Sequence, residues 1–238
     1  MSIEMRKVGI ARRTGFAESA CFVTCRLRDA ISDSRCQELV QRQSHWLHRV
    51  ALQGINPAER KPRAHKLLFG HLDDVLDRSQ GSAALTRSYQ ARLLTRALWK
   101  YHGSSYHLLG YCIMPNHLHV LFYPRLSRSG AEQLRSFDPL GEHPDPESPL
   151  KAILKAWKKV LSTDAVPGRP ASTIGWHPNS YLQVLHSEEE LQRTREYLAY
   201  NPVKAGLAEQ PYQWPWSSSY RRRTRQGNAA RSLPVIPT

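Results

Sequence analysis

The sequence predicts an α+β domain in which short apolar strands alternate with amphipathic helices. Residues 19–28 (ESACFVTCRL) are rich in residues that favour strands, and the apolar spacing that follows predicts a helix over 32–53. Residues 105–113 and 117–123 predict two more strands, and the MPN between them is typical of a turn, so they are expected to form a β-hairpin. A chain of 238 residues suits one main domain with extensions.

Further elements follow from apolar periodicity along the chain. Helical spacing predicts helices over 86–101 and 148–162, the second with a basic face. Residues 181–185 suggest a short strand, whereas residues 66–72 (KLLFGHL) are interpreted as a short strand or a packed loop.

A late helix is expected from Glu188 to Tyr200 or Asn201. Ser187 and Glu190 have the spacing of a capping box, which indicates where the helix begins. Pro202 disfavours helical geometry in the residue before it, so the helix is expected to end there.

Composition divides the chain into three parts. Residues 1–18 predict a basic N-terminal extension, 19–220 the main domain, and 221–238 a basic C-terminal tail expected to be flexible. Within the main domain, 127–149 is rich in Gly, Pro, Ser and charge and is expected to be a mobile loop. The first residues lack the apolar segment of a signal peptide, and no apolar run reaches the roughly 18 residues of a membrane helix, so a cytoplasmic protein is expected.

The charge of the chain favours a polyanionic partner. Its formal net charge is +14 with a pI near 10.0, and 25 of its 34 cationic residues are Arg, whose planar fork suits phosphate. Nucleic acid is the simplest such partner, although ribosomal and membrane-surface proteins are also basic. The four cysteines do not form paired C-x-x-C motifs, so buried free thiols are expected rather than a zinc site or disulfides: Cys21, Cys25, Cys36 and Cys112.

Two histidines inside the second strand of the hairpin are the main chemical signal. Residues two apart on a strand share a face, so His117 and His119 lie together while Leu118, Val120 and Phe122 face the other side. Two neutral imidazoles are natural ligands for a divalent metal, but a third ligand must come from elsewhere. An exposed or hydrogen-bonded histidine pair is the alternative.

Tyr197 and Asn201 are the candidates for the rest of the site. They are four residues apart on the late helix and therefore share a face, which brings a phenol and a carboxamide together. A tyrosine at helical spacing is also common in protein cores, so this pair alone is a weak signal.

The motifs taken together resemble a known family. YCIMPNHLHVLFYP, then YLAYNPVKAGL and YQWPWSSSY, resemble the single-tyrosine HUH transposases, and among them the REP-associated tyrosine transposases, from about Ala20 to Tyr220. The resemblance implies a ferredoxin-like antiparallel sheet backed by helices. It implies that His117 and His119 bind the metal, that Tyr197 is the nucleophile and that Asn201 is the third ligand.

Tyr200 is a competing nucleophile, but the residue four positions after it is Lys204, which cannot coordinate a metal as a cation. Tyr197 is therefore preferred.

The resemblance also implies a reaction and its partners. The expected activity is that of a DNA endonuclease and strand transferase that uses Mg²⁺ or Mn²⁺ and passes through a 5′-phosphotyrosine. The expected substrate is single-stranded or hairpin DNA with REP-like palindromes, and the protein is expected to be a monomer or a homodimer. Basic residues that could contact this DNA are Lys155, Lys158 and Lys159 on the predicted helix and Arg221, Arg222 and Arg223 in the tail.

Two other functions fit parts of the sequence. A catalytically inactive DNA-binding protein would keep the fold and the basic surface without the reaction. A zinc-stabilised RNA-binding module would use the histidines for structure and would bury Tyr197 in the core. The RNA-binding module predicts that Tyr197→Phe leaves every activity unchanged.

Overall fold

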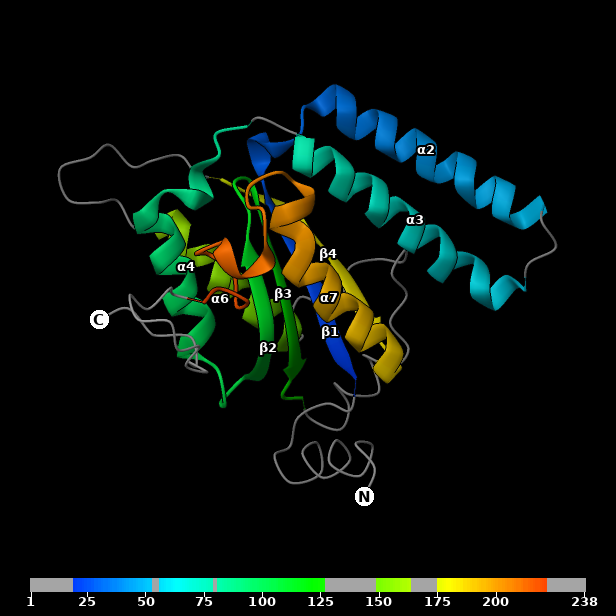
Figure 1. The fold of residues 1–238 in the computed structure, drawn as a ribbon. Helices are drawn as coiled ribbons and strands as arrows, with labels where there is room; N and C mark the ends of the chain where they lie inside the picture. The colour runs from blue at the N-terminus through cyan, green and yellow to red at the C-terminus, as the bar shows by residue number, and fades with distance from the viewer. Residues whose placement is uncertain (1–18, 53–55, 79–80, 127–148, 164–174, 222–238) are drawn as a thin grey trace, which may run out of the picture.

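The computed structural model describes residues 19–52, 56–78, 81–126, 149–163 and 175–221 (Figure 1). The N-terminal extension (1–18), nearly all of the loop predicted at 127–149 and the tail from 222 onward lie outside these residues. The strands and main helices are β1 (Ala20–Leu27), α2 (Asp33–Leu52), α3 (Pro57–Arg78), α4 (Ser88–Lys100), β2 (Tyr106–Ile113), β3 (His117–Pro124), α6 (Pro149–Thr163), β4 (Trp176–Leu185) and α7 (Glu188–Lys204).

The four strands form one antiparallel sheet in the order β2-β3-β1-β4. This is the strand order of a ferredoxin-like fold, so the predicted fold class is confirmed. β2 and β3 form the predicted hairpin, and its turn is closed by a hydrogen bond from the Met114 N–H to the His117 carbonyl. The central position of β3 places His119 beside Thr24 of β1 and Cys112 of β2.

Helices cover both faces of the sheet, with α3 and α7 in front and α4 and α6 behind in the view of Figure 1. The alternation along β3 divides its side chains as predicted. Leu118, Val120 and Phe122 are buried in one core with Trp157 of α6 and Leu94 of α4, among others. The opposite face carries a smaller apolar cluster that joins β1, β2 and β3 to α7, and its buried members are Ala20, Phe22, Cys112, Met114, Leu121, Leu185, Leu191 and Leu198. His117 and His119 lie on this second face.

A close approach between β2 and α7 sets the position of the late helix. A Cβ added to Gly110 would lie 2.8 Å from Cδ2 of Leu198 and 3.2 Å from Oγ of Ser218. A larger residue would overlap α7, so the absence of a side chain at position 110 lets the helix pack directly on the strand. Leu198 follows Tyr197, and this contact therefore helps to place the candidate nucleophile.

The interpretation of residues 66–72 as a strand or a loop was wrong, because these residues lie in the middle of the long helix α3. His65, Phe69, Leu72 and Leu76 recur at helical spacing and turn one side of α3 toward the molecule. Seven residues are about two helical turns, which is too short to separate the helical period from that of a strand. The same helix carries Asp73, whose carboxylate is buried.

The late helix begins where predicted but ends further along the chain. Ser187 accepts a hydrogen bond from the Glu190 N–H, while the Glu190 carboxylate accepts one from the His186 N–H. The expected end before Pro202 was wrong, since α7 continues through Pro202 to Lys204. Proline removes a hydrogen bond of the last turn, but Pro202 is buried, and Lys204 beyond it forms ion pairs with α3 that hold this turn in place.

Three cysteines with described side chains are free thiols inside the sheet: Cys21, Cys25 and Cys112. Burial raises the pKa of the Cys21 and Cys112 thiols above the ordinary range, so both stay protonated near neutral pH.

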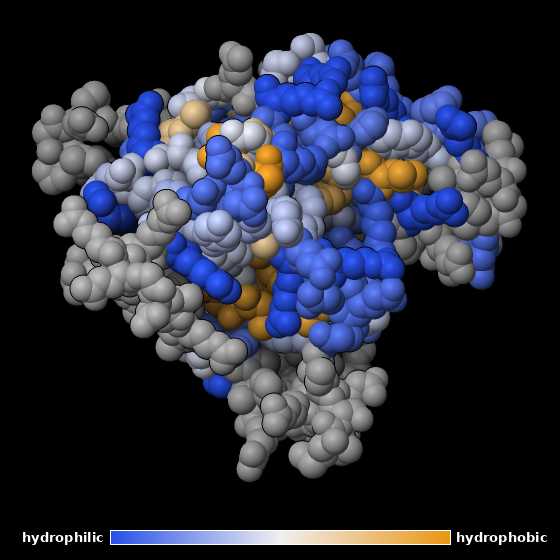
Figure 2. Space-filling view, in the orientation of Figure 1, coloured by the Kyte–Doolittle hydropathy of each residue, from blue (hydrophilic) through white to orange (hydrophobic). Residues whose placement is uncertain are grey.

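No helix in the described part of the chain is long and apolar enough to cross a membrane. The visible surface is mostly hydrophilic, with apolar residues in separate small patches (Figure 2).

Candidate active site

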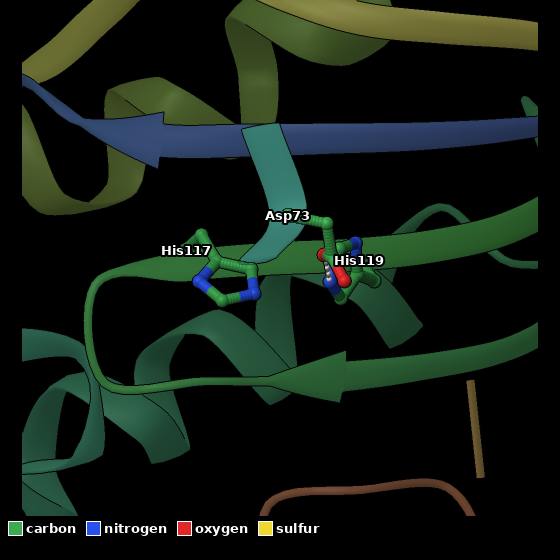
Figure 3. Close-up of side chains that lie close together, drawn as sticks. All are labelled: Asp73, His117 and His119. Carbon is green, nitrogen blue, oxygen red and sulfur yellow. Dashed lines mark ion pairs between the residues drawn. The ribbon is translucent and has the colours of Figure 1, made fainter. Parts of the chain in front are cut away.

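His117 and His119 project from β3 toward the same side, where Asp73 of α3 lies (Figure 3). Both side chains are fully buried, and their ring centroids are 4.6 Å apart. Burial contradicts an exposed histidine pair, whereas the hydrogen-bonded form of that alternative agrees with the partners of both Nδ1 atoms. Burial lowers the pKa of His117 well below its ordinary value, and the neighbouring His119 lowers it further, so His117 is neutral at physiological pH. A neutral imidazole is the form that binds a metal.

Asp73 is a member of this site that the sequence reasoning missed. It lies on α3, its side chain is 1% exposed, and its Oδ1 is 3.3 Å from Nε2 of His119 (Figure 3). Ligand atoms of Asp73, His117 and His119 all lie within 4.8 Å of one another, and these three residues are called the His–Asp cluster below. The LDDVLD segment contains Asp73 and Asp77 one helical turn apart, a signal that becomes visible once the segment is known to be helical.

Hydrogen bonds from the surrounding chain orient both imidazoles. Nδ1 of His117 lies 2.6 Å from Oδ1 of Asn116, which only accepts, so Nδ1 carries the proton and Nε2 is left with a free lone pair. Asn116 is itself held by its Nδ2, which donates to the Leu76 carbonyl of α3. Nδ1 of His119 lies 2.8 Å from the Thr24 hydroxyl, which can donate or accept and so supports either tautomer.

The donor atoms suit a divalent metal ion. Nε2 of His117, Nε2 of His119 and Oδ1 of Asn201 are buried and make no well-aligned hydrogen bond to any described residue. A buried polar atom without a partner costs about 1–3 kcal/mol, and a metal ion bound between the imidazoles would satisfy their Nε2 atoms. Two imidazole nitrogens with carboxylate and amide oxygens form a mixed set that Mg²⁺, Mn²⁺ and Zn²⁺ all accept.

Tyr197 and Asn201 lie together at this site on α7. Nδ2 of Asn201 donates to the Tyr197 hydroxyl at 2.9 Å, as their spacing predicted. The Tyr197 ring packs against three rings at centroid distances of 5.7–5.9 Å: His119, Phe22 and Phe69. Tyr200, the competing tyrosine, points away, with 58% of its surface exposed.

The electrostatic environment keeps Tyr197 protonated in the absence of an added cation. Burial raises the pKa of Tyr197 far above its ordinary value, and the charge of Asp73 raises it further. Burial would also raise the pKa of Asp73, but hydrogen bonding and charge from His119 outweigh it and hold this pKa below the usual range. Asp73 is therefore ionised, and its negative charge acts on the nearby Tyr197 phenol.

Lys204 neutralises part of the carboxylate charge. Its Nζ lies 3.0 Å from Oδ2 of Asp73, 2.7 Å from Oδ1 of Asp74 and 3.2 Å from Oδ2 of Asp77. Burial would lower the pKa of Lys204, but the bonds to Asp74 and Asp73 raise it above its ordinary value. The last turn of α7 is therefore bound to α3 by a charged contact beside the His–Asp cluster.

The basic residues predicted to contact DNA do not lie among the residues of this site. Lys155, Lys158 and Lys159 are on α6, which packs on the opposite face of the sheet (Figure 1). Lys155 and Lys159 are exposed, whereas Nζ of Lys158 donates to the carbonyls of His177 and Pro178. Arg221 is exposed at the end of the described chain, and Arg222 and Arg223 lie outside the described residues.

Comparisons with known proteins give one structural similarity. No protein-family model matches the chain, and no curated protein matches its sequence. A solved structure described as a REP-associated tyrosine transposase bound to a REP hairpin is similar over 84% of this chain and 76% of that chain, with a TM-score of 0.43 and 16% sequence identity.

Proposed function

We propose that the protein is a metal-dependent DNA endonuclease and strand transferase that uses Tyr197 as its nucleophile. One observation carries this proposal: Tyr197 packs against His119, and Nε2 of the adjacent, buried His117 makes no hydrogen bond to a described residue. A histidine pair that only stabilised the fold would have its nitrogens paired. Here Nε2 of His117 has no partner among the described residues and Nε2 of His119 faces only the Asp73 carboxylate, and His119 packs against a phenol that can attack a phosphate.

The metal would be held by His117, His119 and Asn201, with Asp73 as a further oxygen ligand. Mg²⁺ or Mn²⁺ fits a phosphate substrate and these oxygen donors. When bound, such an ion would polarise the scissile phosphate, and its positive charge would lower the pKa of the Tyr197 phenol. Because Asp73 and Asn201 both reach Tyr197, the same residues would link ion binding to the position of the nucleophile.

The reaction assigned to Tyr197 is an in-line displacement at phosphorus. Its hydroxyl oxygen bonds to the phosphorus while the bond to the 3′ oxygen breaks, giving a 5′-phosphotyrosine and a free 3′ hydroxyl. The phenol loses its proton as the new bond forms and the departing 3′ oxygen gains one, so the step leaves the net proton count unchanged. Asn201 donates to the phenol oxygen and orients it. The new phosphodiester keeps the energy of the broken bond, so a 3′ hydroxyl can attack it in reverse and rejoin a strand.

Single-stranded or hairpin DNA is the substrate class that we infer. The net charge of +14 and the excess of Arg favour a nucleic acid. The resemblance of MPNHLH and YLAYNPVKAGL to the single-tyrosine HUH transposases specifies DNA. The alternative that best fits the same surface is a DNA-binding protein without catalytic activity, and the following experiment separates the two.

The test is a cleavage assay with a 5′- or 3′-labelled DNA hairpin that carries single-stranded flanks. With Mn²⁺ or Mg²⁺, the native protein should produce a free 3′ end and a covalent protein–DNA adduct that survives a denaturing gel. Tyr197→Phe should abolish the adduct, and Tyr200→Phe should retain it. An unchanged adduct with Tyr197→Phe contradicts the proposed nucleophile. Binding without cleavage across a panel of hairpins and metals favours the inactive DNA-binding protein.

A further inference from the structure

Lys204 contacts three carboxylates of one helix at the same time. Its Nζ reaches Asp73, Asp74 and Asp77 at 3.0, 2.7 and 3.2 Å, and ligand atoms of these three residues, the acidic cluster, lie within 4.8 Å of one another. A group of oxygen atoms at this spacing is what a divalent cation needs. In this protein an ammonium group of the chain occupies the position.

Asp73 belongs to both clusters. Its Oδ1 faces Nε2 of His119, and its Oδ2 accepts a hydrogen bond from Lys204. A carboxylate with one oxygen in each cluster places two cation positions side by side, one among the histidines and one among the aspartates. Centres with two divalent ions share a bridging carboxylate in this way.

The acidic cluster carries more negative charge than Lys204 removes. The side chains of Asp73 and Asp77 are 1% and 7% exposed, and neither oxygen of Asp77 makes a well-aligned hydrogen bond to a described residue. Buried carboxylates in this state attract a cation strongly. If Lys204 were absent, the three oxygen-bearing side chains would be left with a vacant cation position.

We propose that Lys204 is a positioning residue that takes the place of a second divalent ion and so limits the centre to one metal. This inference rests on the proposed function, in which the first ion lies at His117 and His119. Lys204 holds Oδ2 of Asp73 and leaves Oδ1 for the His–Asp cluster. A fixed ammonium supplies the charge of a second ion without offering the second position to a metal from solution.

The test counts bound Mn²⁺ in the full-length protein by electron paramagnetic resonance and calorimetry. The native protein should bind one ion, Lys204→Gln should bind two, and Lys204→Arg should bind one. Adding Asp77→Asn to Lys204→Gln should remove the second ion. Lys66→Gln is the matched control, because Lys66 also joins α3 to α7, through an ion pair of 2.7 Å with Glu190, but does not contact the acidic cluster. This control should bind one ion.

The cleavage rate gives a second measurement. Lys204→Gln should lower it by about 10- to 100-fold, the usual loss when a residue that orients a metal ligand is removed. Lys204→Arg should recover most of the rate, and Lys66→Gln should leave it near the native value.

Two results overturn the inference alone: a native protein that binds two ions, or a folded Lys204→Gln protein that still binds one with native affinity. The number of ions bound by the native protein can be measured even if Lys204→Gln does not fold. A native protein that binds no Mn²⁺, or that binds it equally well after His117→Ala and His119→Ala, overturns the proposed metal site and this inference with it.

Discussion

Oδ1 of Asp73 lies 3.3 Å from Nε2 of His119, so a helix that precedes the hairpin contributes a carboxylate to the histidine pair on its second strand. Both side chains are buried, which makes their interaction stronger than the same contact at the surface. The candidate site is therefore assembled from three elements, α3, β3 and α7, and depends on how they pack together.

Asp73→Asn should weaken Mn²⁺ binding by about 10- to 100-fold, because it removes a negative ligand and the partner of His119. Asp74→Asn is the matched control: Asp74 also pairs with Lys204, but its side chain is 46% exposed and lies outside the His–Asp cluster. Calorimetric titration of both variants checks the difference. Equal affinities would show that Asp73 has no role in holding the metal.

Asn116 should be required for metal binding because it fixes the tautomer of His117. Asn116→Ala removes both the acceptor for Nδ1 of His117 and the donor to the Leu76 carbonyl, and should lower the free energy of unfolding by about 1–3 kcal/mol. Asn116→Asp keeps the acceptor and should retain more of the Mn²⁺ affinity. Urea unfolding and metal titration measure the two effects, and native Mn²⁺ affinity in Asn116→Ala would contradict the assigned role.

The stability of the metal-free protein should fall in mild acid because of His117. The pKa of this histidine is lowered by burial in the folded state, so the unfolded chain binds the proton more tightly. The stabilisation is present above the ordinary pKa of 6.5 and is lost as the pH falls below it, by at most about 1.4 kcal/mol per pH unit for this group.

Urea unfolding in a chelator, from about pH 7 to about pH 5, measures this slope. His117→Gln should make the slope shallower. His177 is the comparison, because its pKa is also lowered but its side chain is less buried. His177→Gln should therefore change the slope less than His117→Gln does. A slope that is the same in the native protein and in His117→Gln would contradict this prediction.

Gly110→Val should destabilise the protein by about 1–3 kcal/mol, because the new side chain meets Leu198 where a Cβ alone would lie 2.8 Å from it. The displacement of α7 should also slow cleavage, since Tyr197 precedes Leu198. The double variant Gly110→Val with Leu198→Ala should be less destabilised than the sum of the single variants. Additive losses in thermal unfolding would exclude this contact as the cause.

The sheet and half of the site could be predicted from local patterns. The alternation of Leu118, Val120 and Phe122 with His117 and His119 has the period of a strand, and the structure places the two sets on opposite faces. The spacing of Tyr197 and Asn201 has the period of a helix, and their side chains are hydrogen-bonded. Both patterns depend only on the geometry of one element, so they can be read without knowledge of the rest of the fold.

The contribution of α3 could not be predicted in the same way. The window 66–72 contains apolar residues compatible with a strand, and only the longer run to Leu76 reveals the helical period. Asp73 then looks like an ordinary polar residue of a surface helix. Its burial depends on how α3 packs over β3, which no local pattern specifies. The extension of α7 past Pro202 is similar, because ion pairs with another helix outweigh a local preference.

The sequence by itself determined most of the strands and helices, the placement of two imidazoles on one face of a strand, and the proximity of a phenol to an amide on one helix. Each of these follows from repeat distances within a single strand or helix. Only the tertiary structure decided that the imidazoles are buried, that Asp73 lies in their cluster and that Lys204 forms an ion pair with the second oxygen of Asp73. Those features arise where elements distant in sequence exclude water together, and the resulting burial sets both the pKa of His117 and the charge that a bound cation must balance.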